Sequence, residues 1–108
     1  MKIALPTPIK LYLQADADKD ESLFTQCFAP DAEVRDEGRT IKGVEAIRVW
    51  KRDAKKKYQY EVHPLAALQD GDMVSLTARL TGKFPGSPVE LTYAFVLRDD
   101  RIASLEIR

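Results

Sequence analysis

The sequence lacks the features that define several functional classes. Its single cysteine, Cys27, excludes an internal disulfide and a cysteine-based zinc site. No apolar run approaches the roughly 20 residues that a helix needs to cross a bilayer, and the N-terminus carries no secretory signal. The 17 basic and 17 acidic side chains leave no net charge, which argues against nucleic acid or an anionic membrane as a partner. We therefore expect a cytoplasmic protein with no nucleic-acid or membrane partner.

Motifs for metals, phosphates and nucleophiles are also missing. The only histidine, His63, has no second ligand at a suitable spacing, and no glycine-rich phosphate loop, GxSxG or HExxH occurs. We expect neither a metal nor a cofactor. The basic run KRDAKKK at residues 51–57 is interpreted as the solvated end of a helix, where cations complement the helix dipole, with a phosphate-binding patch as the alternative.

What is present predicts one globular domain over residues 1–108, with 44% hydrophobic and 31% charged residues. Thr7 as a cap and Pro8 at the first helical position predict a first helix. Asp20 is expected to cap a second, short helix over residues 21–28, and Gly43 to open a third. The apolar stripes expected to face the core are Ile9, Tyr12, Leu13 and Ala17 on the first helix, Leu23, Phe24, Cys27 and Phe28 on the second, and Val44, Ile47, Trp50 and Ala54 on the third.

Strand patterns dominate the rest of the chain. Residues 32–38 read as a strand, and residues 39–43 as a turn. Three long β-rich runs follow at residues 58–68, 73–84 and 89–97, separated by the turn signals DGD and PGSP, and RDDR precedes a last run at residues 102–108. Helices followed by an antiparallel meander predict an α+β fold, in which a curved sheet carries the helices on one face.

The charged stretch EVRDEGR at residues 33–39 contains the main candidate for chemistry. Side chains alternate between the two faces of a strand, so Val34 and Asp36 share one face, while Glu33, Arg35 and Glu37 share the other. The opposite phase would bury three charges to expose a valine, at a much larger cost. Asp36 is therefore predicted to point inward, where desolvation raises the pKa of a carboxyl and makes it a better base near neutral pH.

Structural interpretations of the same residues remain open. Spacing alone favours a structural role for Asp36, either capping a turn or pairing with an arginine, for which the candidates are Arg39, Arg48 and Arg79. Tyr12 taken alone is typical of a core aromatic whose hydroxyl reaches a rim. Trp50 is typical of a core or pocket-wall residue.

The order of elements resembles a known family. The stretch YLQADADKDESLFTQCFAPDAEVRDEGRTIKGVEAIRVW, continued by FPGSPVEL and DRIASLEI, is similar to the SnoaL-like (polyketide-cyclase-like) branch of the nuclear-transport-factor-2-like superfamily. The resemblance covers nearly the whole chain. It implies an NTF2-like cone of three N-terminal helices packed on a curved, mainly antiparallel sheet. Its motifs are specific for fold and weakly specific for function, because the superfamily includes enzymes, binders and scaffolds.

Ketosteroid isomerase, within that superfamily, suggests roles for individual residues. Tyr12 and Asp36 fall at the positions of its tyrosine donor and its general base, so the resemblance implies that Asp36 removes a proton and that Tyr12 stabilises an oxyanion. The enzyme's second acid should fall near residues 92–93, where this chain has Thr92 and Tyr93. That departure, together with Asp16 beside Tyr12, argues against steroid isomerisation itself. The expected ligand site combines Asp16 and Tyr93 with a lining of Val34, Trp50, Leu91 and Phe95.

Three hypotheses remain open. The first is a pocket for a small apolar or aromatic molecule with acid–base chemistry, such as isomerisation, cyclisation or hydration. The second is a binder that uses the same cavity without catalysis. The third is an interaction module that pairs as a homodimer through the outer sheet face, since both faces of MVSLTARL and LTYAFVL carry apolar residues.

Overall fold

The computed structural model describes residues 5–18 and 21–108, and the cap predicted at Asp20 lies outside them. The helical elements are α1 (Thr7–Asp18), the single turn η1 (Glu21–Leu23), α2 (Phe24–Cys27) and α3 (Val44–Tyr58). The strands are β1 (Phe28–Asp36), β2 (Arg39–Lys42), β3 (Glu61–Asp70), β4 (Met73–Thr81), β5 (Val89–Arg98) and β6 (Arg101–Ile107).

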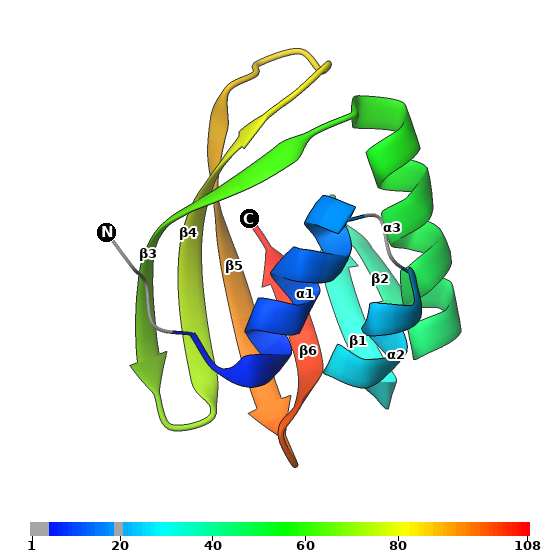
Figure 1. The fold of residues 1–108 in the computed structure, drawn as a ribbon, viewed down its shortest axis with the longest axis vertical. Coiled ribbons are helices and arrows are strands. Elements are labelled where there is room, and N and C mark those ends of the chain that lie inside the picture. The colour runs from blue at the N-terminus through cyan, green and yellow to red at the C-terminus, as the bar shows by residue number, and fades with distance from the viewer. Residues whose placement is uncertain (1–4, 19–20) are drawn as a thin grey trace.

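The six strands form one curved, unclosed sheet in the order β2-β1-β6-β5-β4-β3. All neighbours are antiparallel except β1 and β6, which run parallel. Figure 1 shows α1 crossing one face of the sheet and α3 standing beside β1 and β2. This is the α+β, NTF2-like cone predicted from the sequence, with three helices of which α1 and α3 are long.

Two local predictions were wrong because strand pairing overrides the local pattern. Residues 28–31 were assigned to the second helix and its end, but β1 begins at Phe28, which pairs with Ile102 of β6. A register irregularity between Phe28 and Glu33 accommodates Pro30 within the strand. Residues 39–42 were read as a turn, but they form β2, which pairs antiparallel with β1.

The turn that creates this hairpin also places Asp36. Asp36 pairs with Arg39, so only Glu37 and Gly38 lie between β1 and β2. Both have positive φ, 53° and 75°, as the two central residues of a tight hairpin turn require. Asp36 is therefore the last residue of β1, at an end of the sheet rather than in its middle.

A cluster of aromatic rings forms the centre of the core. Tyr12 on α1 is fully buried and makes edge-to-face contacts with Phe24, Phe28, Tyr93 and Phe95, at centroid distances of 6.2, 5.8, 6.3 and 5.6 Å. Such pairs add roughly 0.5–1.5 kcal/mol each beyond the area that they bury. Tyr12 thus joins α1 to α2, β1 and β5. The alternating burial along β4 adds further apolar side chains to the sheet's inner face.

Candidate functional site

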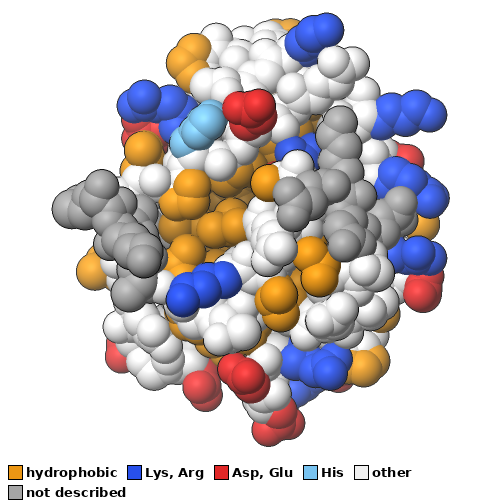
Figure 2. Space-filling model, in the orientation of Figure 1, with side chains coloured by type: hydrophobic (Ala, Val, Ile, Leu, Met, Phe, Trp, Pro, Cys, Tyr) orange, Lys and Arg blue, Asp and Glu red, His pale blue; other side chains and the backbone are white. Residues whose placement is uncertain are grey.

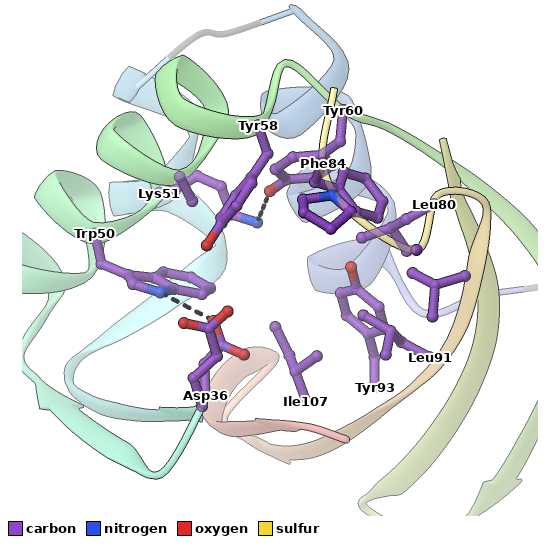
Figure 3. A pocket seen from close by; sticks show the side chains of 15 residues that line it. Asp36, Trp50, Lys51, Tyr58, Tyr60, Leu80, Phe84, Leu91, Tyr93 and Ile107 are labelled. Carbon is purple, nitrogen blue, oxygen red and sulfur yellow. Dashed lines mark hydrogen bonds between the residues drawn. The ribbon is translucent and has the colours of Figure 1, made fainter. Parts of the chain in front are cut away.

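A cavity of about 410 Å³ opens between α3 and the inner face of the sheet. Its wall is mostly apolar and aromatic, with a few polar groups, which is typical of a ligand site. The residues that line it include Asp36, Trp50, Lys51, Tyr60, Leu91 and Tyr93. Figure 3 shows Asp36 and Trp50 on one side of the cavity, with Tyr60, Leu80 and Tyr93 across from them.

Asp36 faces this cavity, as strand alternation predicts. Ala32 and Val34 of the same parity are buried, while Arg35 and Glu37 are exposed. The indole N–H of Trp50 donates a hydrogen bond of 3.3 Å to Oδ2 of Asp36. Among the described residues, the hydrogen bond to this carboxylate thus comes from a neutral donor on α3, and not from one of the arginines considered from the sequence.

The surroundings of Asp36 raise its pKa. Desolvation by burial has the largest effect, and the neighbouring carboxylate of Glu37 adds to it. The hydrogen bond from Trp50 and the charges of Lys51 and Arg39 act in the opposite direction without cancelling the rise. A half-buried carboxyl with a raised pKa at an apolar cavity has the properties of a general base.

A hydrogen-bond donor lies across the cavity from Asp36. The hydroxyl of Tyr93 points into the space from β5, while that of Tyr58, at the end of α3, lies on the Trp50 side (Figure 3). The Tyr60 hydroxyl, in the segment before β3, accepts from Lys51 and donates to Asp16. Burial raises the pKa of both Tyr60 and Tyr93, so both remain protonated at neutral pH. Gly82 makes room for this segment, because a Cβ at residue 82 would lie 2.7 Å from the Cα of Tyr60.

Lys51 is the largest departure from the sequence-based interpretation. The run at residues 51–57 was read as solvated, but Lys51 is only 3% exposed and Lys55 10% exposed at their side chains. Lys51 Nζ lies 3.1 Å from Asp16 Oδ1 and donates a 2.7 Å hydrogen bond to the Tyr60 hydroxyl. Lys55 Nζ lies 3.1 Å from Asp16 Oδ2. The prediction is wrong for these two lysines, because a single carboxylate from α1 holds them against the core. It is right for the exposed remainder of the run, namely Arg52, Asp53, Lys56 and Lys57.

The predicted site residues divide into two groups. Asp36, Trp50, Leu91 and Tyr93 line the cavity together. Four others do not line it: Tyr12, Val34 and Phe95 belong to the core, and Asp16 lies behind Lys51 in the buried ion cluster. The hydroxyl of Tyr12 is buried without a hydrogen-bond partner among the described residues, so it is not presented to a ligand in the cavity.

Two smaller hollows flank the ion cluster. One, of about 360 Å³, lies between α1 and the start of β3, where Leu13, Val62 and His63 contribute to its wall. Figure 2 shows this face of the molecule, with hydrophobic side chains in a hollow and the histidine at its edge.

Among residues 5–18 and 21–108, no group of three or more His, Cys, Asp or Glu side chains is placed to hold a metal ion. In the same part of the chain, no helix is long and apolar enough to cross a membrane.

Residues 9–105 match the model of the SnoaL-like domain. The chain belongs to the SnoaL-like family. Among curated proteins, no sequence matches it.

Solved SnoaL-like and related structures share the whole fold. A Sinorhizobium meliloti protein proposed to be a polyketide cyclase is 46% identical, with a TM-score of 0.94 over 96% of this chain and 95% of its own. A Catenulispora acidiphila protein of ketosteroid-isomerase-like fold, in complex with trimethylamine, is 22% identical, with a TM-score of 0.84 over 97% and 86%. An Agrobacterium tumefaciens protein, proposed to be an isomerase of the SnoaL-like family, is 20% identical, with a TM-score of 0.78 over 94% and 92%. The last two show the fold alone.

Several cavity residues of this SnoaL-like chain were not singled out from its sequence. Lys51 lies mid-way along α3 in a run that looks like ordinary charged surface. Tyr58 and Tyr60 flank the end of that helix, and Phe84 lies in a loop. One signal was available for Lys51: it follows the stripe residue Ile47 by four positions, which places it near the buried side of α3. A lysine on that side needs a buried acid, and Asp16 was already noted beside Tyr12 on the first helix.

Proposed function

We propose that this SnoaL-like protein binds a small, largely apolar molecule in the cavity and catalyses acid–base chemistry on it, with Asp36 as the general base. The observation that carries the proposal is the placement of Asp36 at the wall of an apolar cavity, held by Trp50 and with its pKa raised by burial. The proposed cyclase activity of the 46%-identical relative is consistent with chemistry of this class.

In this proposal the hydrogen-bond donor is Tyr93 rather than Tyr12. The hydroxyl of Tyr93 faces the cavity opposite Asp36, whereas that of Tyr12 is enclosed in the core. Removal of a proton from carbon beside a carbonyl leaves negative charge on the carbonyl oxygen, which a neutral phenol stabilises by hydrogen bonding. Isomerisation, cyclisation and hydration each include such a proton transfer, either as the first step or, in the reverse direction, as a later one.

Proton exchange tests the base without knowledge of the natural substrate. 2-Tetralone is a bicyclic ketone with acidic C–H bonds, and NMR in D₂O follows the loss of these protons. We expect the wild-type protein to accelerate exchange and Asp36→Asn to lose at least about tenfold of that acceleration, since a positioned base contributes roughly 10²–10⁴-fold. Glu33→Gln is the matched control, because Glu33 is an acid of the same strand, lies on its opposite face and does not line the cavity.

Binding measured alongside exchange separates the alternatives. Quenching of Trp50 fluorescence reports entry of the ketone into the cavity, and Asp36→Asn is expected to retain binding. If the ketone binds to the wild type without faster exchange, the cavity belongs to a non-catalytic binder. If exchange is unchanged in Asp36→Asn, Asp36 is not the base.

We also propose a homodimer formed through the outer sheet face. Leu68, Met73 and Val96 are 79, 60 and 37% exposed, and strand register places them on the same face of β3, β4 and β5. Light scattering at micromolar concentration is expected to report a dimer that Leu68→Glu dissociates. Val49→Glu, at an exposed position on α3, is expected to leave the dimer intact. A wild-type monomer under these conditions contradicts the dimer.

A further inference from the structure

Among the residues that the structure describes, the ion cluster beside the cavity consists of one carboxylate and two ammonium groups. The Asp16 carboxylate is 2% exposed and lies 3.1 Å from the ammonium groups of both Lys51 and Lys55. The Tyr60 hydroxyl donates to Asp16 Oδ1 at 3.1 Å, and Lys55 donates to the Tyr60 carbonyl oxygen at 2.6 Å. Within this described cluster, one carboxylate therefore serves two cations.

The environment of Lys51 stabilises its charged form without neutralising it. Its Nζ lies 4.7 Å from the ring centroid of Trp50 and 4.9 Å from that of Tyr12, in cation–π geometry. Burial alone lowers the pKa of Lys51, but the surrounding tyrosine hydroxyls and the Asp16 carboxylate raise it well above its usual value. Lys51 is thus a cation at any physiological pH.

Lys51 is also the one cation among the described residues that line the cavity. The acids facing the same space are Asp36 and Glu37, and Asp36 takes its hydrogen bond from Trp50. Figure 3 shows the lysine ammonium beside the Tyr60 hydroxyl, with the Tyr93 hydroxyl across the cavity. A buried ammonium with phenol groups nearby is suited to receive a carboxylate, because charge-assisted hydrogen bonds are roughly twice as strong as neutral ones.

We infer that the ligand of this cavity is an apolar carboxylic acid, and that Lys51 is the residue that receives its carboxylate. Its apolar body contacts the side chains of Leu80, Phe84 and Leu91 on the cavity wall. The anionic group adds a second negative charge to the one that Asp16 supplies among the described residues of the cluster. This inference rests on the proposed function only in taking the cavity as the ligand site, and it does not depend on catalysis by Asp36.

A matched pair of probes tests the inference in the unmodified protein. 2-Naphthoate and 2-naphthamide have nearly the same shape, but only the first is charged at neutral pH. Calorimetry is expected to show that the acid binds at least about tenfold more tightly than the amide, a difference typical of one charge-assisted contact. Equal affinities overturn the inference and leave the proposed function standing. If these probes and 2-tetralone all fail to bind, both fall.

Variants assign the preference to Lys51. Lys51→Met is expected to abolish the acid-over-amide ratio while leaving amide affinity within about threefold, and Asp16 keeps its contact with Lys55 in this variant. A purely structural role of Lys51 would instead weaken both probes equally, which would overturn the assignment. Lys56→Met, an exposed position on the same helix, is the control and should keep the wild-type ratio. If Lys51→Met does not fold, the wild-type comparison still decides whether the cavity prefers the acid.

Discussion

The indole N–H of Trp50 and the carboxylate of Asp36 are joined by a hydrogen bond of 3.3 Å between α3 and the end of β1. Trp50 is the only tryptophan in the chain, so its fluorescence has a single source. This source lies directly against the proposed base. The pair therefore offers an internal reporter of the protonation state of Asp36.

The first prediction is a fluorescence titration of Trp50. We expect emission to change with a midpoint above pH 3.8, the usual pKa of an aspartate, because burial raises the pKa of Asp36. Asp36→Asn should remove the transition. Glu37→Gln should move the midpoint down, because the charge of Glu37 contributes to the raised pKa. A midpoint at or below 3.8 in the wild type would contradict the assigned environment.

The second prediction concerns stability and pH. The pKa of Asp36 is higher in the folded than in the unfolded chain, so the folded state binds more protons across the interval between the two values. The stability contributed by this carboxyl is present at low pH and lost as the pH rises through its folded pKa. Urea unfolding from about pH 3 to about pH 7 should show wild-type stability falling relative to Asp36→Asn. Wild-type stability that rises with pH relative to that of Asp36→Asn would contradict the raised pKa.

The third prediction compares the same change, loss of one hydroxyl, at two buried tyrosines. The Tyr12 hydroxyl has no partner among the described residues, so Tyr12→Phe should be neutral or stabilising by up to about 1 kcal/mol. The Tyr60 hydroxyl accepts from Lys51 at 2.7 Å and donates to Asp16 at 3.1 Å, so Tyr60→Phe should cost about 1–3 kcal/mol. Chemical denaturation measures both. Equal losses would show that the Tyr12 hydroxyl has a partner after all.

The fourth prediction concerns the thiol of Cys27. The side chain is fully buried, and burial raises its pKa to about 12. Ellman's reagent at about pH 8 should therefore react with native Cys27 at least about a hundredfold more slowly than with an exposed thiol. Val49→Cys in a Cys27→Ser background supplies that exposed reference on α3, away from the outer sheet face. Rapid reaction of the native protein would show that α2 opens readily.

Elements with a strong local pattern were predictable. The apolar stripe of α3 and the alternation along β4 reflect the 3.6- and 2-residue periods that a helix and a strand impose on a buried face. The inward orientation of Asp36 followed from the same rule, because exposing Val34 to bury three charges is too costly. Turn signals such as DGD also marked a real hairpin between β3 and β4.

Elements whose conformation depends on a partner strand were not predictable. β2 is a strand because β1 lies beside it, and residues 28–31 are extended because β6 pairs with Phe28. Tyr12 matches a known donor position, yet its hydroxyl is in the core, since helix periodicity specifies a face and not how far a side chain lies from a cavity. Local propensity yields to strand pairing wherever the two compete.

The sequence by itself determined the fold class, the inward face of β1 and therefore the direction of Asp36, because these depend on periodicity and on the cost of burying charge. The tertiary structure alone decided which polar groups meet at the cavity. Lys51 in a basic run becomes a buried cation because α1 brings Asp16 within 3.1 Å of it. Whether a charged side chain is solvated or buried depends on a partner that only folding supplies.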